Sequence, residues 1–322
     1  MKAAIVRHAG QTPAYADFPE PVPSAGESLI AVTAAAISNV SRSRASGTHY
    51  SSSGEFPLVA GIDGVGRLED GRRVYFVLPR PPHGSIAERT VAPNAHCVPV
   101  PDDLDDVMAA AIANPGLSSW AAFTERARLK AGETVLVNGA TGMAGQLAVQ
   151  IAKHLGAGKV IATGRDPDRL RVLASLGADE TIRLTGEDDA LEQSFMARFA
   201  RGIDVVIDYL WGASAERLLI PAAKAGPEAV PIRFVQVGSA SGQEITLPSA
   251  VLRASAIELM GSGIGSVALE RLVGITGEVL RAAASRGSRI AVDPVPLSEV
   301  GETWTRTDSA ARIVLTNDAT GV

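Results

Sequence analysis

A glycine-rich turn between a short apolar run and an amphipathic segment constrains this chain most. The β-branched run Thr134–Val137 predicts a buried strand, and Met143–Leu155 places apolar residues on one helix face. The turn between them contains Ala140-x-Gly142-x-x-Gly145, an alanine variant of the dinucleotide-binding fingerprint. Small residues there permit a tight turn, close approach to a pyrophosphate and close helix packing, while the helix N-terminus attracts phosphate. The alternative is a purely structural turn, but the flanking strands and helix favour a dinucleotide site.

The end of the next predicted strand distinguishes between the two nicotinamide dinucleotides. An NAD-binding protein places Asp or Glu there to bind the ribose 2′-hydroxyl, whereas an NADP-binding protein has a nearby arginine. Here Gly164 occupies the acidic position, Arg165 follows it, and Arg169 lies one helical turn later. Because a guanidinium binds phosphate oxygens in a paired geometry, we predict NADP. The alternative is that Asp166 and Asp168 pair with both arginines on a solvated surface.

The rest of the chain shows two patterns. Residues 1–114 alternate short apolar runs with Gly and Pro, which predicts a strand-rich domain with long loops. From about residue 116 to 263, predicted strands alternate with helices, which indicates parallel βαβ units. Residues 289–295 and 313–316 return to a strand pattern, with a helix expected near residues 298–306.

Composition narrows the possible classes of protein. The 322 residues, 46% hydrophobic and 20% charged, predict two globular domains rather than disorder. The net charge of −5 argues against nucleic-acid binding, and a single cysteine, Cys97, excludes an internal disulfide. No apolar run reaches the about 18 residues of a membrane helix, and Met1–Val6 is too short for the apolar core of a signal peptide. We therefore expect a cytoplasmic protein with no nucleic-acid or membrane partner.

Short blocks with a characteristic order and spacing extend over the whole chain. They are Met1–Ala4, Ser46–Gly47, Pro57–Gly66, Gly71–Val74, Gly84–Glu88, Ala131–Val137, Val237–Gly238 and Arg312–Leu315. Together with the glycine turn, they resemble the medium-chain dehydrogenase/reductase superfamily, in its zinc-independent quinone oxidoreductase branch. The resemblance implies an α/β protein with a GroES-like β-rich catalytic domain (1–117 and 264–322) and a Rossmann doubly wound parallel-sheet domain (118–263). It also implies an active site in the cleft between them.

The same resemblance predicts that no zinc is used. Zinc-dependent members carry a Cys, a Gly-His-Glu motif and a further Cys or Asp as ligands. Here Ser38 takes the first position and Gly61-Ile62-Asp63 replaces the motif, whereas zinc needs at least three suitable ligands. Asp63 is expected to brace a turn. Without a Lewis acid, an acceptor that conjugation already makes electrophilic is the easier substrate.

Three residues are candidates for catalysis. Ser38 and Asn39 lie in the segment that lines the nicotinamide pocket of similar reductases, although a simple polar loop is the alternative. Tyr50 lies near the substrate-mouth tyrosine of relatives, offset by one residue, and could donate a proton; the alternative is a loop aromatic. The size of the pocket depends on how segments 47–55 and 79–84 fold.

Candidate cofactor-binding residues lie in the glycine turn, at strand ends and before a predicted helix. Ser118 matches a family threonine that contacts the cofactor near the nicotinamide, and a helix N-cap is the competing interpretation. For the strand-end residues the alternative is an ordinary turn. The other candidates are Ala140, Thr141, Gly142, Met143, Ala144, Gly145, Gly164, Arg165, Arg169, Tyr209, Val237, Gly238, Ser239, Gly261, Ser262 and Gly263.

These observations predict an NADPH-dependent reductase that transfers hydride to a quinone or to the β-carbon of an α,β-unsaturated carbonyl. The proton would come from Tyr50, a ribose hydroxyl or water. A non-catalytic NADPH-binding protein on the same fold is the alternative. The only argument for a scaffold or nucleic-acid-binding role is that members of the family have diverse functions. Because relatives often dimerise through the edge of the Rossmann sheet, here about residues 256–261, a homodimer is expected by analogy.

Overall fold

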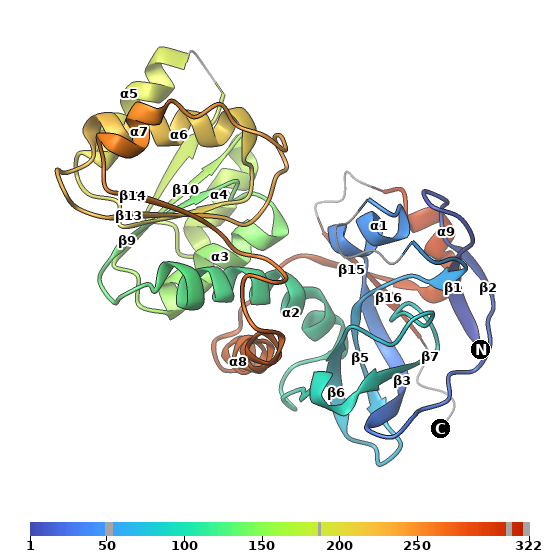
Figure 1. Cartoon of the computed structure of the whole chain (residues 1–322). Coiled ribbons are helices and arrows are strands. Elements are labelled where there is room, and N and C mark those ends of the chain that lie inside the picture. The colour runs from blue at the N-terminus through green and yellow to red at the C-terminus, as the bar shows by residue number, and fades with distance from the viewer. Residues whose placement is uncertain (49–53, 186–187, 307–310, 318–322) are drawn as a thin grey trace. The chain divides into compact units, whose positions relative to one another are not determined.

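The computed structural model describes residues 1–48, 54–185, 188–306 and 311–317 (Figure 1). Contacts divide the chain into two units, unit 1 with residues Met1–Asn114 and Glu270–Val322, and unit 2 with residues Pro115–Leu269. The domain limits expected at 117/118 and 263/264 stay predictions. So does the assignment of catalysis to one part and of cofactor binding to the other. Within the described ranges, no helix is both long and apolar enough to cross a membrane.

Unit 2 is built on a six-stranded parallel sheet. Its strands are β9 (Thr134–Asn138), β10 (Lys159–Gly164), β11 (Glu180–Arg183), β12 (Val205–Asp208), β13 (Ile232–Gln236) and β14 (Ile257–Gly261). They lie in the order β11-β10-β9-β12-β13-β14. This is the doubly wound Rossmann order, and its direction reverses between β9 and β12. Ligands of such sheets bind beyond the carboxyl ends of the strands at this reversal.

Helices cover the parallel sheet. They are α3 (Met143–His154), α4 (Pro167–Ser175), α5 (Asp188–Phe199), α6 (Gly212–Ala225) and α7 (Ser249–Arg253). In Figure 1, α6 and α7 lie on one side of the sheet and α3 lies on the other. Burying apolar side chains on both faces supplies the main stabilisation of a parallel sheet.

Unit 1 contains a seven-stranded sheet and a three-stranded sheet. The larger has the order β15-β16-β3-β5-β6-β8, with β7 paired to β3, and the smaller has the order β2-β1-β4. The strands are β1 (Lys2–Val6), β2 (Ala14–Asp17), β3 (Glu27–Ala36), β4 (Leu58–Val59), β5 (Asp63–Leu68), β6 (Arg73–Val77), β7 (Arg89–Pro93), β8 (Cys97–Pro99), β15 (Val292–Pro296) and β16 (Arg312–Thr316). The C-terminal strand β16 pairs with β3, so both ends of the sequence build one sheet. The mixed α/β class with a β-rich GroES-like part is confirmed.

One helix of the β-rich part differs from the sequence-based expectation. The helix expected near residues 298–306 is a 3-10 turn (Leu297–Glu299) followed by α9 (Val300–Thr303). The remaining helices of the β-rich part are α1 (Asn39–Ala45), the first part of α2 (Asp106–Ala121), and α8 (Leu269–Arg286). Pro115 lies inside α2.

A buried carboxylate ties together three segments of unit 1. Asp63, only 1% exposed, accepts a hydrogen bond from Tyr75 Oη at 2.5 Å and one from Asn114 Nδ2 at 3.2 Å. Burial raises the pKa of Asp63, and the nearby guanidinium of Arg312 opposes part of that rise. Asp63 therefore joins β5, β6 and α2, a wider bracing role than one turn.

Replacing Asp63 with alanine leaves the Tyr75 hydroxyl, the Asn114 amide and the buried Arg312 guanidinium without this partner. We expect the free energy of unfolding to fall by about 3–5 kcal/mol, as in other buried charges that lose their partner. Urea denaturation followed by circular dichroism measures the change. Asp70→Ala is the control, since Asp70 is exposed and bonded to Arg72, and it should leave stability unchanged. Equal effects of the two substitutions would contradict the bracing role.

Candidate functional site

The glycine turn connects β9 to α3 at the carboxyl edge of the parallel sheet. Gly139 has a φ of +81°, a left-handed conformation that glycine adopts without strain. Gly142 is the N-cap of α3 and no described side chain caps the helix, so its first N–H groups are free of such partners. A Cβ on Gly142 would meet only the Gly139 carbonyl oxygen, at 3.9 Å, so the space beside it is open. Backbone N–H groups at an uncapped helix start favour an anion.

Gly145 has a different role in the same turn. A Cβ there would lie 2.5 Å from Ala140 Cα and 2.6 Å from the Gly139 carbonyl oxygen. Both atoms belong to the backbone, so they cannot rotate away as the end of a flexible side chain can. Gly145 therefore permits α3 to pack against the turn, as the fingerprint requires.

Buried polar side chains fix this turn to the ends of three adjacent strands. Thr163 Oγ1 donates to Asn138 Oδ1 at 2.7 Å and accepts from the Gly139 N–H at 3.0 Å. Asn138 Nδ2 donates to Asp208 Oδ1 at 2.8 Å. Asn138, Thr163 and Asp208 are each fully buried. We call these three residues the strand-end network; none of the three was among the candidate site residues predicted from the sequence.

Asp208 also organises the turn after β12. Its carboxylate accepts from the backbone N–H groups of Leu210 at 3.0 Å and Trp211 at 3.1 Å. Burial raises the pKa of Asp208, while these donors and the Asn138 amide act in the opposite direction. Both carboxylate oxygens of Asp208 thus accept hydrogen bonds within the fold.

Two predicted cofactor-binding residues, Ser118 and Tyr209, make hydrogen bonds in or near α2. Ser118 lies inside α2 and donates to the Pro115 carbonyl at 2.9 Å, so the prediction that it caps a following helix is wrong. The cap fails because the helix already begins at Asp106. The Tyr209 hydroxyl lies 2.6 Å from Ser119 Oγ, and burial raises the pKa of Tyr209. Cofactor contacts of Ser118 and Tyr209 stay predictions.

The end of β10 carries an exposed positive charge. A Cβ at Gly164 would lie against the Cγ2 methyl group of Thr141 in the glycine turn, so a larger residue would require that side chain to move. Arg165 is exposed and forms no ion pair with any residue that the structure describes. Arg183, at the end of β11, is exposed and opposite Gly164 in the strand register. The sequence analysis did not consider Arg183, whose proximity depends on strand pairing.

The two aspartates after Arg165 have other partners. Asp166 caps α4 by accepting from the N–H groups of Asp168 and Arg169, and these bonds lower the pKa of Asp166. Its carboxylate lies 3.9 Å from Arg169 Nε. Asp168 pairs with Arg171. The alternative in which these aspartates neutralise both predicted arginines therefore fails for Arg165.

The remaining strand-end candidates use part of their backbone within the fold. The N–H groups of Val237 and Gly238 donate to the Asp208 carbonyl at 2.8 and 3.1 Å. Gly263 donates to Ser266 Oγ at 2.8 Å. Those three N–H groups are thus occupied, and roles for these residues and for Ser239, Gly261 and Ser262 stay predictions.

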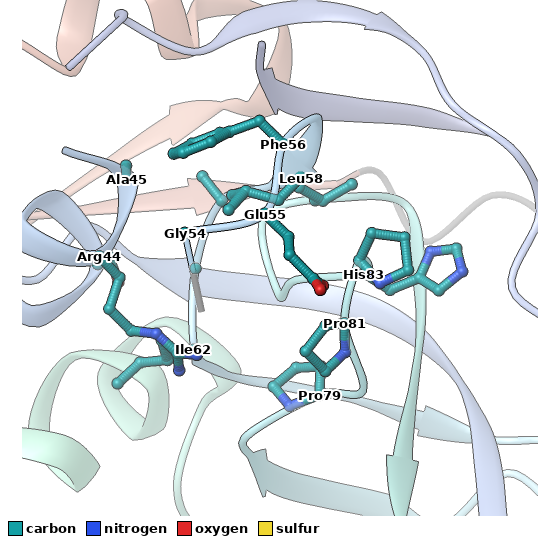
Figure 2. A pocket seen from close by; sticks show the side chains of 15 residues that line it. Arg44, Ala45, Gly54, Glu55, Phe56, Leu58, Ile62, Pro79, Pro81 and His83 are labelled. Carbon is teal, nitrogen blue, oxygen red and sulfur yellow. The ribbon is translucent and has the colours of Figure 1, made fainter. Parts of the chain in front are cut away.

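Unit 1 contains a small hollow that is open to solvent (Figure 2). Segments 54–62 and 79–83, together with Ser41, Arg44 and Ala45 at α1, line it. The hollow thus includes parts of both segments expected to set the pocket size. Most of its walls are apolar, which suits a largely apolar small molecule.

The predicted catalytic residues lie at the start of α1 and beyond it. Ser38 is buried and caps α1, since its Oγ accepts from the Ser41 N–H at 2.9 Å and lies 2.8 Å from Ser41 Oγ. Asn39 is exposed. Tyr50 lies outside the described residues. Catalytic roles for all three stay predictions.

The positions that correspond to zinc ligands do not fit a zinc ion. Ser38 is committed to its helix cap, Ile62 has no ligand atom, and the Asp63 carboxylate is bound to Tyr75 and Asn114. In the part of the chain with described coordinates, no three His, Cys, Asp or Glu side chains are grouped to hold a metal. Burial raises the pKa of the Cys97 thiol to about 11, which disfavours the thiolate that zinc requires.

Comparisons with known proteins identify the family of this chain. A family model described as zinc-binding dehydrogenase matches residues 144–275, a range without Ser38 or Asp63. The quinone oxidoreductase of Lama guanicoe is 30% identical over 252 residues, 75% of this chain and 73% of that protein. The chain belongs to the quinone oxidoreductase-like family of medium-chain dehydrogenases/reductases.

Other members of the family resemble this quinone oxidoreductase-like chain over nearly its full length. A probable NADPH-dependent quinone reductase, tdiC, of Emericella nidulans is 29% identical over 362 residues, covering 98% of this chain and 99% of that protein. The quinone oxidoreductase of Thermus thermophilus, whose structure was solved alone and with NADPH, is 26% identical. Its TM-score is 0.82, with 98% of this chain and 100% of that chain covered.

The contact at Gly145 gives a prediction about the stability of this quinone oxidoreductase-like chain. A glycine-to-alanine change inside a helix ordinarily stabilises by about 1 kcal/mol. Gly145→Ala should instead lower the free energy of unfolding by about 1–3 kcal/mol, because the new methyl group overlaps backbone atoms. Gly274→Ala in α8 is the matched control, since its Cβ would meet only the Arg271 side chain, at 3.8 Å. Thermal unfolding without nucleotide should give opposite signs; a stabilised Gly145→Ala would contradict the packing role.

Proposed function

We propose that this protein is an NADPH-dependent reductase that acts on quinones or on the activated C=C bond of α,β-unsaturated carbonyls, without zinc. The observation that carries the proposal is the open, uncapped start of α3 beside the point where the strand order reverses. Arg165 at the neighbouring strand end, which has no ion pair within the described ranges, selects the phosphorylated cofactor. The names of the Emericella and Thermus relatives, which mention NADPH and quinones, support the same assignment.

Unit 2 binds the cofactor. The N–H groups at the first turn of α3, from Met143 and Ala144, hold the pyrophosphate, while Gly142 leaves room for it. Arg165 and Arg169, with Arg183 from the adjacent strand, hold the 2′-phosphate. When bound, NADPH supplies the hydride.

Unit 1 binds the acceptor in its apolar hollow. Apolar walls exclude water around a conjugated acceptor and leave its carbonyl to a few polar groups. Hydrogen bonds to the developing enolate or quinol oxygen then stabilise the transition state, the task a metal performs in zinc enzymes. Asn39 and Tyr50 are the proposed donors, and Ser38 orients the start of α1 by capping it.

Zinc independence is part of the proposal. It is supported by the side chains at the three ligand positions. Ser38 caps a helix, Ile62 is aliphatic, and Asp63 is hydrogen-bonded within the core. Elemental analysis of purified protein should find far less than one zinc per chain, and EDTA should not reduce turnover. A stoichiometric zinc whose removal abolishes turnover would contradict this part.

The proposed assembly is a homodimer formed at the edge of the parallel sheet. β14 is the last strand in the sheet order, and Leu259 on it and Ile264 after it are 37% and 43% exposed. Covering apolar side chains beside a strand edge favours association. Multi-angle light scattering measures the mass directly, and a monomer at micromolar concentration would contradict this part of the proposal.

The activity itself is tested by following NADPH absorbance with a panel of quinones and enones. Turnover with at least one acceptor, together with reduced product identified by mass spectrometry, is expected. NADPH binding without turnover across the panel would favour the non-catalytic alternative. Absence of NADPH binding would contradict both.

The role of Arg165 gives a matched prediction. Arg165→Ala removes hydrogen bonds to the 2′-phosphate, so it should raise KM for NADPH about tenfold. This effect is at the lower end of the range for hydrogen bonds to charged groups, because the site is exposed. KM for NADH should remain unchanged. Arg171→Ala is the control, since that exposed arginine pairs with Asp168. Equal changes in the two KM values for Arg165→Ala would contradict the phosphate assignment.

A further inference from the structure

Arg44 lines the hollow of unit 1 with its positive charge uncompensated by the described residues. Its side chain leaves α1 and extends towards Ile62 (Figure 2). The guanidinium of Arg44 makes no hydrogen bond or ion pair with any residue in the described ranges. Burial lowers the pKa of Arg44, which shows that its surroundings disfavour the positive charge.

Two other partly buried arginines of unit 1 have a partner for at least part of the guanidinium, although Nε of Arg42 has none among the described residues. Arg73 pairs with Asp106 at 2.6 Å and also donates to the Leu104 carbonyl. Arg42, on the same helix as Arg44, donates to the Arg306 carbonyl at 2.8 Å. A desolvated charge without such partners costs stability, and an anion bound beside it would offset that cost.

The other residues of the hollow would orient a bound molecule. Glu55 lies away from Arg44, with its carboxylate towards Pro81 (Figure 2). The walls between are largely apolar, with Phe56 and Leu58 among them. An anionic group is therefore attracted to the Arg44 end, whereas an uncharged body fits the apolar walls.

We propose that Arg44 binds a carboxylate of the acceptor, so that the preferred substrates are quinones or enones that carry an acidic group. This inference rests on the proposed function, because it specifies the acceptor of the same reaction. A carboxylate matches the guanidinium in size and geometry, since two oxygens can accept two parallel N–H bonds.

The test compares one enone in two forms, para-carboxybenzylideneacetone and its methyl ester, with NADPH as reductant. We expect kcat/KM for the acid to exceed that for the ester about tenfold, mainly through KM, as for one charge-assisted hydrogen-bonded pair at a half-exposed site. Arg44→Gln should remove this preference and leave the ester within about twofold of wild type. Arg44→Lys should retain part of this preference, because lysine keeps the positive charge but lacks the two parallel N–H donors of the guanidinium.

Arg7→Gln is the matched control, since it removes the same charge at an exposed position of unit 1 outside the hollow. The acid-to-ester ratio should not change in this variant. Equal turnover of acid and ester by the wild type, or an equal loss for both in Arg44→Gln, would overturn the inference while leaving the reductase function intact.

A direct binding measurement separates the two proposals if neither form is reduced. That result would count against the proposed function. Titration calorimetry would then compare binding of the acid to wild-type protein and to Arg44→Gln. About tenfold weaker binding to the variant, with unchanged melting temperature, supports the anion site; equal binding overturns it.

Discussion

The buried hydrogen bonds among Asn138, Thr163 and Asp208 are the interaction on which the proposed cofactor site depends. They connect the carboxyl ends of β10, β9 and β12, at the reversal of strand order. Because each partner is fully buried, losing one would leave the others unsatisfied at about 1–3 kcal/mol each. The network thereby fixes where the glycine turn leaves the sheet and where α3 begins.

The network also occupies the carboxylate of Asp208 within the fold. Asp208 is an acidic group at this edge, and its oxygens are occupied by the Asn138 amide and by the N–H groups of Leu210 and Trp211. The glycine turn offers backbone N–H groups, and the adjoining strand ends offer Arg165 and Arg183. Backbone N–H groups and arginines at this edge suit a ligand with a pyrophosphate and an additional phosphate.

Sequence reasoning predicted the features that depend on local order. The strand, turn and helix around Gly142 and Gly145 follow from neighbouring residues, and the alternation of strands and helices indicated the class of fold. Strand pairing could not be deduced in the same way. Asn138 lies opposite Asp208 only in the parallel register of β9 and β12, 70 residues apart in sequence. The alternative cap at Ser118 failed for a similar reason, because Pro115 lies within α2 rather than before a new helix.

The candidate acceptor site was harder to predict than the cofactor site. Ser38 and Asn39 came from a family resemblance, and the structure adds that Ser38 caps α1. Arg44 belongs to no motif that the sequence analysis identified. Whether the charge of Arg44 is compensated depends on which side chains lie around it in the folded protein. That cannot be deduced from the sequence alone. The apolar hollow likewise joins segments 54–62 and 79–83, which only the tertiary fold brings together.

Hydrogen exchange with and without saturating NADPH tests the central claim most directly. If the turn held by the strand-end network binds the dinucleotide, amides of residues 139–146 should gain the largest protection, and those at the end of β10 should gain a smaller one. The sheet of unit 1 should change little. Unaltered exchange in residues 139–146 at saturating NADPH would contradict the account.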